Sequence, residues 1–228
     1  MRKVIATAFV SLDGVMQAPG QPEEDPTGGF KYGGWTVPYW DDAIGAAMAQ
    51  VFSSPFALLL GRRTYDIFAA YWPHIEVDPS ASTFKELNAQ IARTFNEATK
   101  YVATHSQGTL SWQNSESLGN DVPGRVRELK KQNGPMLLVQ GSSELLQTLL
   151  AHDLVDEIRL LTYPVVFGKG KRFFGDGTIP AAFKLTSSAS APSGVLIASY
   201  ERAGEIKTGS FALEDPTDAE LERRKHLK

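Results

Sequence analysis

The chain has 228 residues, of which 42% are hydrophobic and 21% are charged, and its formal net charge at pH 7 is -3. These proportions exclude an intrinsically disordered or collagen-like chain, because enough apolar surface is available to offset the chain entropy lost on folding. The absence of cysteine excludes disulfides, thiolate metal ligands and a cysteine nucleophile, and no basic block of the kind that nucleic-acid binding needs is present.

Short apolar runs that alternate with helical patterns predict an α/β fold. Strands are expected at residues 4–10, 56–60, 101–104, 136–140 and 157–163, and helices at 41–53, 64–71, 83–98, 121–133 and 143–152. The strand runs are apolar almost throughout, which is typical of a parallel sheet buried on both faces. Segments 183–189 and 195–201 flank a Pro-Ser-Gly turn and predict an antiparallel hairpin at one edge. Thr83 and Glu86 predict a capping box at the start of the third helix.

The apolar run at residues 4–10 is too short for the core of a signal peptide. The longest apolar stretches also fall short of the ~20 residues of a membrane-spanning helix. We therefore expect a cytoplasmic protein that has neither membrane nor nucleic-acid partners.

Two segments stand outside the α/β alternation. Residues 16–40 are rich in proline, glycine and aromatic residues, and we expect them to form a lid that is mobile without ligand. Residues 204–228 form a charged extension of a single domain at residues 1–203. Thr217 and Glu220 are placed to cap a short terminal helix, which is either a solvated surface helix or an oligomer contact.

Two strands are each followed by residues that suit an anionic ligand. Gly61, Arg62, Arg63 and Thr64 open the helix after the strand at 56–60, where amide N–H groups and guanidinium forks can meet phosphate oxygens. A second turn follows the strand at 136–140. The carboxyl ends of parallel strands meet at one edge of a sheet, so the two turns support each other. An ordinary pair of surface arginines is the plain alternative.

The second turn contains Gly141, Ser142 and Ser143. A glycine there would let the backbone approach a pyrophosphate closely, and the helix that follows would present its amide groups. A serine that simply caps the helix is the structural alternative. The turn lacks the spacing of the dinucleotide glycine fingerprint, so the pattern does not indicate a standard Rossmann site.

Taken in order, the motifs resemble the dihydrofolate reductase-like superfamily. Within it they are most similar to the reductase domain of the bifunctional riboflavin-biosynthesis deaminase/reductase and its stand-alone relatives. The motifs are SLDG at 11–14, LGRRTY at 60–65, LVQGS at 138–142, LVDEIRL at 154–160 and PVVFGKG at 164–170. The resemblance covers roughly residues 3–202. It implies a three-layer α/β/α fold around a mostly parallel sheet, NADPH as the hydride donor, and a homodimer.

The resemblance also implies a cofactor-binding set. Its members are Gly61, Arg62, Arg63, Thr64, Thr104, His105, Gly141, Ser142 and Ser143. Arg62 matches the arginine that meets the adenosine 2′-phosphate, and Arg63 and Thr64 match contacts to the pyrophosphate. Ser142 is a departure, because relatives commonly carry a second glycine at that place.

Three acidic residues are candidates for catalysis in a reductase of this kind. Asp13 ends the first strand, and we favour it as a substrate contact, although an Asp-Gly pair is also an ordinary turn. Asp41 and Asp42 lie near the place where folate reductases keep a carboxylate, and they could equally complement a helix dipole. A proton donor near neutral pH would need a pKa that burial has raised.

Aromatic residues beside these acids suggest the shape of the substrate. Trp35, Tyr39 and Trp40 could form a wall against a flat heterocycle, or they could be ordinary packing. The leading interpretation is an NADPH-dependent reductase of a pterin, a flavin precursor or a ribosylaminopyrimidine, similar to 5-amino-6-(5-phosphoribosylamino)uracil reductase. The alternative is a non-catalytic NADP-binding or sensor module on the same fold.

The sequence gives little support to two other kinds of site, a metal site and a serine acyl-enzyme site. The four histidines show no pair at i and i+4, so no metal site is predicted. Ser82 and Lys207 begin Ser-x-x-Lys and Lys-Thr-Gly matches to penicillin-recognising enzymes, but the third element is missing and chance explains them better.

Overall fold

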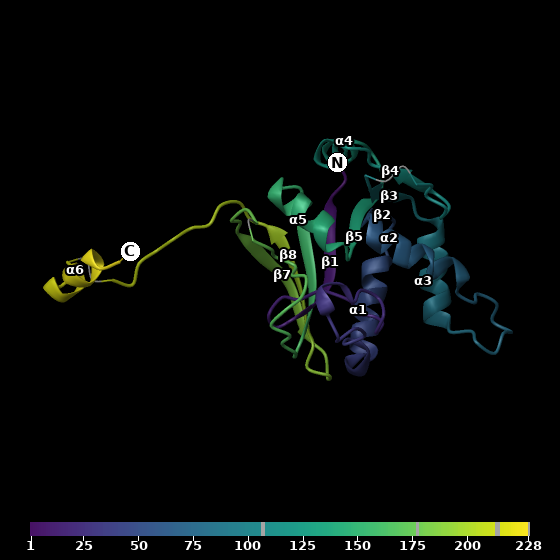
Figure 1. Ribbon diagram of the computed structural model, residues 1–228, viewed down its shortest axis with the longest axis horizontal. Helices are drawn as coiled ribbons and strands as arrows, with labels where there is room; N and C mark the ends of the chain where they lie inside the picture. Colours follow the sequence, from purple (N-terminus) through teal and green to yellow (C-terminus); the bar gives the residue numbers. More distant parts are fainter. Residues whose placement is uncertain (106–107, 177, 213–214, 228) are drawn as a thin grey trace.

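Helices and strands alternate along the chain (Figure 1). The computed structural model describes residues 1–105, 108–176, 178–212 and 215–227. Its strands are β1 (Val4–Ser11), β2 (Phe56–Gly61), β3 (Lys100–Ala103), β4 (Ser115–Ser117), β5 (Met136–Gln140), β6 (Glu157–Tyr163), β7 (Phe183–Ser190) and β8 (Leu196–Arg202). Its α-helices are α1 (Asp42–Phe52), α2 (Arg62–Ala69), α3 (Glu86–Glu97), α4 (Val122–Lys131), α5 (Ser143–Ala151) and α6 (Asp218–Lys225), and short 3-10 turns lie at Thr27–Gly29, Val37–Tyr39 and Trp72–His74.

The strands form one eight-stranded sheet in the order β4-β3-β2-β5-β1-β6-β8-β7. The neighbouring pairs from β4 to β6 are parallel, whereas β8 runs antiparallel to both β6 and β7. This confirms the mostly parallel sheet with an antiparallel C-terminal hairpin. The carboxyl ends of β1, β2, β3 and β5 therefore meet at one edge of the sheet, where the turns with the predicted anion-binding residues lie.

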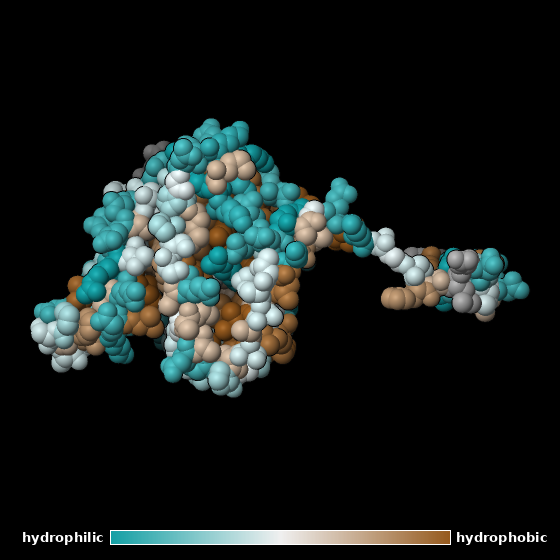
Figure 2. Space-filling view, turned by 180° about the vertical axis from the view of Figure 1, so that it is seen from behind, coloured by the Kyte–Doolittle hydropathy of each residue, from teal (hydrophilic) through white to brown (hydrophobic). Residues whose placement is uncertain are grey.

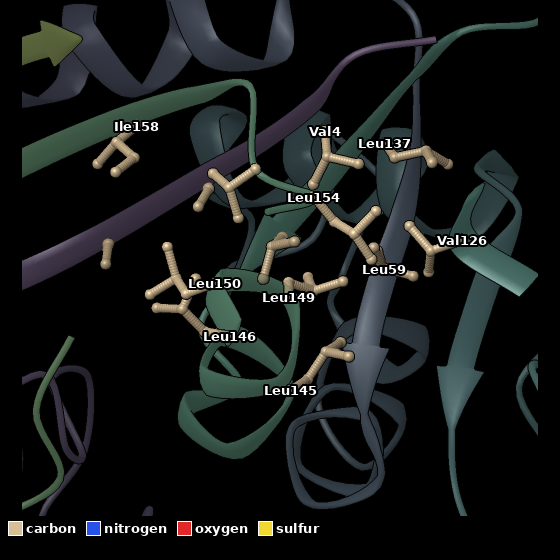
Figure 3. Close-up of a cluster of buried hydrophobic side chains, with 14 of the residues drawn as sticks. Val4, Leu59, Val126, Leu137, Leu145, Leu146, Leu149, Leu150, Leu154 and Ile158 are labelled. Atoms are coloured by element: carbon tan, nitrogen blue, oxygen red, sulfur yellow. The ribbon is translucent and has the colours of Figure 1, made fainter. Parts of the chain in front are cut away.

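Helices cover both faces of the sheet at its centre, which explains why β1, β2 and β5 are mostly apolar. The even-numbered residues of β1 pack into a core cluster with α4 and α5, and Val4 lies there beside Leu149 and Val126 (Figure 3). Ile5 points to the opposite face and belongs to a second cluster with Phe95 of α3. The three layers predicted from the sequence are thus present. The packed core on both faces fixes the carboxyl ends of the central strands, where the turns begin.

The predicted capping box of α3 is wrong. The helix begins at Glu86 with Lys85 as its N-cap residue, and no side chain caps it. Thr83 lies in the turns that precede the helix, in which Phe84 N–H donates to the carbonyl of Ala81. These turns satisfy the backbone locally, so the chain enters the helix later than the Thr-x-x-Glu spacing indicates.

The C-terminal extension ends in α6, which stands clear of the sheet in both views of the molecule (Figures 1 and 2). Thr217 caps the helix as predicted, because its hydroxyl accepts a hydrogen bond from Glu220 N–H at 3.3 Å. Residues 213, 214 and 228 of the extension lie outside the described residues. The division of the chain into 1–203 and 204–228 stays a prediction. Within the described ranges, no helix is both long and apolar enough to cross a membrane.

Candidate functional site

A cleft of about 360 Å³ lies at the carboxyl ends of β2, β3 and β5. It gathers all but one of the residues that the sequence suggested for cofactor binding: Gly61, Arg62, Arg63, Thr64, Thr104, His105, Ser142 and Ser143. The N-termini of α2 and α5 both open at this cleft, so their amide groups can meet a negatively charged ligand. The remaining residue, Gly141, lines an adjoining cavity.

The adjoining cavity is larger, about 520 Å³, and mostly apolar. Aromatic and aliphatic side chains of α1, α2 and α3 line it, namely Met48, Phe52, Ile67, Phe68, Leu87, Ile91 and Phe95. Pro19, Glu24 and Ile67 line both the cavity and the cleft, so the two hollows meet at these residues. The site thus joins a polar cleft suited to phosphates to an apolar cavity suited to a flat ring.

Only Trp40 of the three candidate wall aromatics lines the cavity, and its side chain remains partly exposed. Trp35 is buried, and its ring lies 5.1 Å from that of Tyr163, centroid to centroid. Its indole N–H donates to the carbonyl of Gln17 at 2.8 Å. Tyr39 also packs against Tyr163, at 5.8 Å. Both rings therefore fix segment 16–40 to the sheet, which is the packing role that the sequence left open.

Ser142 connects the two anion-binding turns. Gly141 and Ser142 both have left-handed backbones, with φ of 77° and 67°. The Ser142 hydroxyl does not cap α5 but accepts a hydrogen bond from Gly61 N–H at 2.8 Å. A left-handed backbone favours glycine, which fits the second glycine that the resemblance implies at this place. In this chain a serine bears the strain and ties the turn after β5 to the turn after β2.

Replacing Ser142 with alanine is expected to lower the free energy of unfolding by about 1–2 kcal/mol, because Gly61 N–H loses its acceptor while the backbone strain remains. Replacement with glycine removes the same hydrogen bond but also relieves about 1 kcal/mol of left-handed strain, so its stability should stay close to that of the wild type. Urea unfolding of both variants measures this difference, with Ser143→Ala as the matched loss of a neighbouring hydroxyl. Equal losses for the two Ser142 variants would contradict the account.

Arg62 binds Asp66 through the Nε atom of its guanidinium group, whereas its Nη1 atom lacks a hydrogen-bond partner among the described residues. Its Nε donates to both carboxylate oxygens of Asp66, at 2.9 and 3.0 Å. Its Nη1 is buried and has no hydrogen-bond partner among the residues that the structure describes. A buried donor without an acceptor is costly, so this nitrogen suits a ligand oxygen in the cleft.

Arg63 is held by the segment that covers the cleft. Its Nη1 donates to Asp25 at 2.7 Å, and Lys171 Nζ donates to the other oxygen of the same carboxylate at 2.6 Å. Burial works to raise the pKa of Asp25, but hydrogen bonds from Lys171 and Thr27 outweigh it and lower the pKa to about 2. The carboxylate therefore clamps segment 16–40 over two cations that line the cleft.

Asp13 is occupied by its own chain. Its carboxylate accepts hydrogen bonds from the Ser11 hydroxyl and from the N–H groups of Phe167 and Gly168, and Arg172 lies beside it. Burial works to raise the pKa of Asp13, but these hydrogen bonds lower it overall. Asp13 lines neither the cleft nor the cavity. These contacts fit the turn-forming alternative, and a contact between Asp13 and the substrate stays a prediction.

Asp41 and Asp42 also lie apart from both hollows. Asp41 is the N-cap residue of α1, and its carboxylate accepts from Ile44 N–H and from Ser193 N–H, each at 3.0 Å. Hydrogen bonds from these groups lower the pKa of Asp41. Asp42 is exposed in the first turn of α1. The geometry therefore favours the helix-capping and helix-dipole alternatives over proton donation.

The structure adds polar residues that the sequence analysis missed. Thr7 and Gln140 lie opposite each other in the β1–β5 ladder and line the apolar cavity. Thr7 Oγ1 and Gln140 Oε1 are buried and lack partners within the described part of the chain. The sequence did contain a signal for both residues, because Thr7 lies inside an apolar strand run and Gln140 lies at the end of one. Glu24, which lines both hollows, gave no such signal, because only the folded path of segment 16–40 brings it there.

Comparison with known proteins places this chain in a family. The model described as RibD C-terminal domain matches residues 2–197. The chain is 31% identical over 147 residues to the uncharacterized protein YyaP of Bacillus subtilis (strain 168), covering 64% of this chain and 74% of that protein.

Solved structures match the fold. A pyrimidine reductase-like protein from Corynebacterium diphtheriae superposes with a TM-score of 0.53 at 13% identity, covering 90% of this chain and 93% of that one. Dihydrofolate reductase from Enterococcus faecalis, complexed with NADP(H), gives a TM-score of 0.51 at 12% identity over 88% of this chain and 96% of that one. These matches confirm the dihydrofolate reductase-like fold. Since the family model covers most of the sequence and the fold agrees with it, the chain belongs to the RibD C-terminal domain family.

Proposed function

We propose that the protein is an NADPH-dependent reductase of a flat nitrogen heterocycle, such as a pterin, a flavin precursor or a ribosylaminopyrimidine. The observation that carries this proposal is the junction of two hollows at the carboxyl edge of the sheet. One is a polar cleft at two helix N-termini, and the other is an apolar cavity. Family membership supports an oxidoreductase of this kind.

The residues of the cleft fit the cofactor. The unpartnered Arg62 Nη1 suits a phosphate oxygen, and the left-handed turn at Gly141 leaves room for a close approach. Thr64 and Ser143 lie in the first turns of α2 and α5, where amide groups are available. When bound, NADPH would supply a hydride to the heterocycle. The work of these residues is to hold the anionic part of the cofactor and orient the rest toward the cavity.

The residues of the cavity fit the substrate. Thr7 Oγ1 and Gln140 Oε1 are buried without partners, and each such atom costs about 1–3 kcal/mol. The polar edge of a heterocycle would satisfy both, while the apolar walls exclude water from the reacting atoms. Trp40 adds a partly exposed aromatic ring to the lining of the cavity. This arrangement favours a planar substrate with hydrogen-bonding groups on one edge.

Titration of the intrinsic tryptophan fluorescence with NADPH and NADH tests the cofactor. NADPH consumption then tests catalysis with dihydrofolate, FMN and 5-amino-6-(5-phosphoribosylamino)uracil. We expect NADPH to bind and at least one heterocycle to be reduced. Binding of NADPH without consumption across the panel would favour the sensor module, because the cleft would be used and the cavity would not. Failure to bind either dinucleotide would contradict both proposals.

We also propose that the protein acts as a homodimer. Most of β7 is exposed at the edge of the sheet, and Leu185 and Leu196 of the hairpin are large apolar side chains in contact with solvent. A second copy of the chain could cover this edge with its own identical edge, so that no other protein is needed.

A further inference from the structure

Glu24 is the only ionisable residue of the three that line both the cleft and the cavity. Among the described residues, it is also the only carboxyl group that lines the apolar cavity. The acids that the sequence suggested, Asp13, Asp41 and Asp42, line neither hollow. A proton donor must lie within hydrogen-bond reach of the atom it protonates, so position alone favours Glu24.

The Glu24 side chain is oriented by the backbone of its own loop. Its Oε2 accepts hydrogen bonds from Gly20 N–H at 2.6 Å and from Gln21 N–H at 3.2 Å. Within the described ranges, no hydrogen bond holds Oε1. A carboxylic acid bound in this way can keep its proton on the free oxygen and offer it to a ligand at the junction.

The charges around Glu24 are largely compensated. The titratable or charged groups that line the cleft with it are Asp25, Arg62, Arg63, His105, Glu144 and Lys171, and the cavity adds Tyr71. Arg63 and Lys171 are bound to Asp25, and Arg62 to Asp66, so these cations do not pair with Glu24. Burial raises the pKa of Glu24, and the neighbouring Asp25 charge adds to the rise, although the Gly20 and Gln21 amides oppose it.

We propose that Glu24 is the proton donor of the reduction. As a hydride and its electron pair pass from the dihydronicotinamide to a ring or imine carbon, Glu24 transfers its carboxyl proton to the adjacent nitrogen. The C=N double bond becomes a single C–N bond, the nitrogen gains the proton, and Glu24 is left as a carboxylate that solvent reprotonates. The inference rests on the proposed reductase function and adds the group that completes its chemistry.

A titration of the free protein tests the proton donor without any substrate. The carboxyl carbons are labelled with carbon-13 in glutamate and followed by NMR, and Glu24→Gln identifies the Glu24 signal. We expect Glu24 to titrate above the ordinary glutamate pKa of about 4.3. The exposed neighbour Glu23 is identified in the same way with Glu23→Gln, so that the two signals are told apart. A Glu24 pKa at or below the ordinary value would overturn the proposal.

Turnover provides the second test, with whichever of dihydrofolate, FMN and 5-amino-6-(5-phosphoribosylamino)uracil the wild type reduces. We expect Glu24→Gln to lower kcat about 100-fold or more. The wild-type rate should fall as the pH rises through the pKa of the donor, and the Gln variant should lack this limb. Glu24→Asp should recover part of the rate, because it restores a carboxylic acid, although the shorter side chain holds that acid farther from the substrate. Affinity for NADPH should change by less than about twofold.

The controls separate the two proposals. Glu23→Gln should keep the wild-type rate and pH profile. If Glu24→Gln also keeps them, the donor assignment is overturned while the reductase function stands. If the wild type reduces none of the three heterocycles, the proposed function fails, and the NMR titration still decides whether Glu24 holds a proton above the ordinary range.

Discussion

Replacing Arg62 with alanine is expected to weaken the binding of NADPH about ten- to a hundredfold and to change the binding of NADH far less. The two cofactors differ by the 2′-phosphate, and Arg62 Nη1 is a buried donor that lacks a partner in the described part of the chain. A charge-assisted hydrogen bond at such a place contributes about 1.5–3 kcal/mol. Fluorescence titrations with both dinucleotides give the two dissociation constants from which selectivity follows.

Two controls make this measurement specific. Arg127→Ala removes an exposed guanidinium group from α4 and should leave both affinities unchanged. Asp66→Asn removes the partner of Arg62 Nε while keeping the guanidinium group, so it should preserve the preference for NADPH. Equal losses of NADPH and NADH affinity in Arg62→Ala would remove Arg62 from the 2′-phosphate and leave it a general contact of the cleft.

Replacing Asp25 with asparagine is expected to lower the free energy of unfolding at neutral pH by about 2 kcal/mol. The pKa of Asp25 falls from 3.8 to about 2, so the folded protein favours the carboxylate. This stabilisation is fully present above pH 3.8 and is lost as the pH falls through about 2. Urea unfolding at neutral pH, near pH 4 and near pH 2 should show a steeper acid loss for the wild type than for the variant.

Glu23→Gln is the matched control for Asp25, because it removes a nearby exposed carboxylate from the same segment. It should leave the free energy of unfolding at neutral pH unchanged. An Asp25→Asn protein with wild-type stability at neutral pH would show that the clamp between Arg63 and Lys171 contributes nothing to the fold. The mobility of segment 16–40 without ligand and its closure over bound ligands stay predictions.

The predictable part of the molecule is the part encoded by adjacent residues. Strands β1, β2 and β5 could be found because helices cover both faces of the sheet there, which makes these runs mostly apolar. The short polar strand β4 at the edge of the sheet was not predicted. The anion-binding turns could be found because Arg62 and Ser142 each lie directly between a strand and a helix. The parallel order of the sheet then brings both turns to one cleft without further information.

The rest depends on contacts between residues far apart in the sequence. In the sequence Asp41 looks like a free carboxylate, but in the structure it accepts a hydrogen bond from Ser193 N–H of the distant hairpin turn. Trp35 resembles a lid residue until Tyr163 packs against it. Glu24 lies at the junction beside Asp25, which Lys171 binds from a distant part of the sequence. Periodicity and turn chemistry carry no information about such pairings, so the sequence named Asp13, Asp41 and Asp42 as candidate acids but not Glu24.

The cleft has a charge balance that bears on how fast a dinucleotide arrives. The carboxyl groups of Glu24, Asp25 and Glu144 share its lining with the cations Arg62, Arg63 and Lys171, so these groups leave an excess of one positive charge while Glu24 holds its proton. Such a surface has little excess positive potential to attract a polyanion over distances beyond the Debye length. Association should therefore proceed at the rate of an unsteered encounter and depend weakly on ionic strength. Discrimination between the phosphorylated and unphosphorylated cofactors then resides in the dissociation rate, which short contacts such as that of Arg62 control.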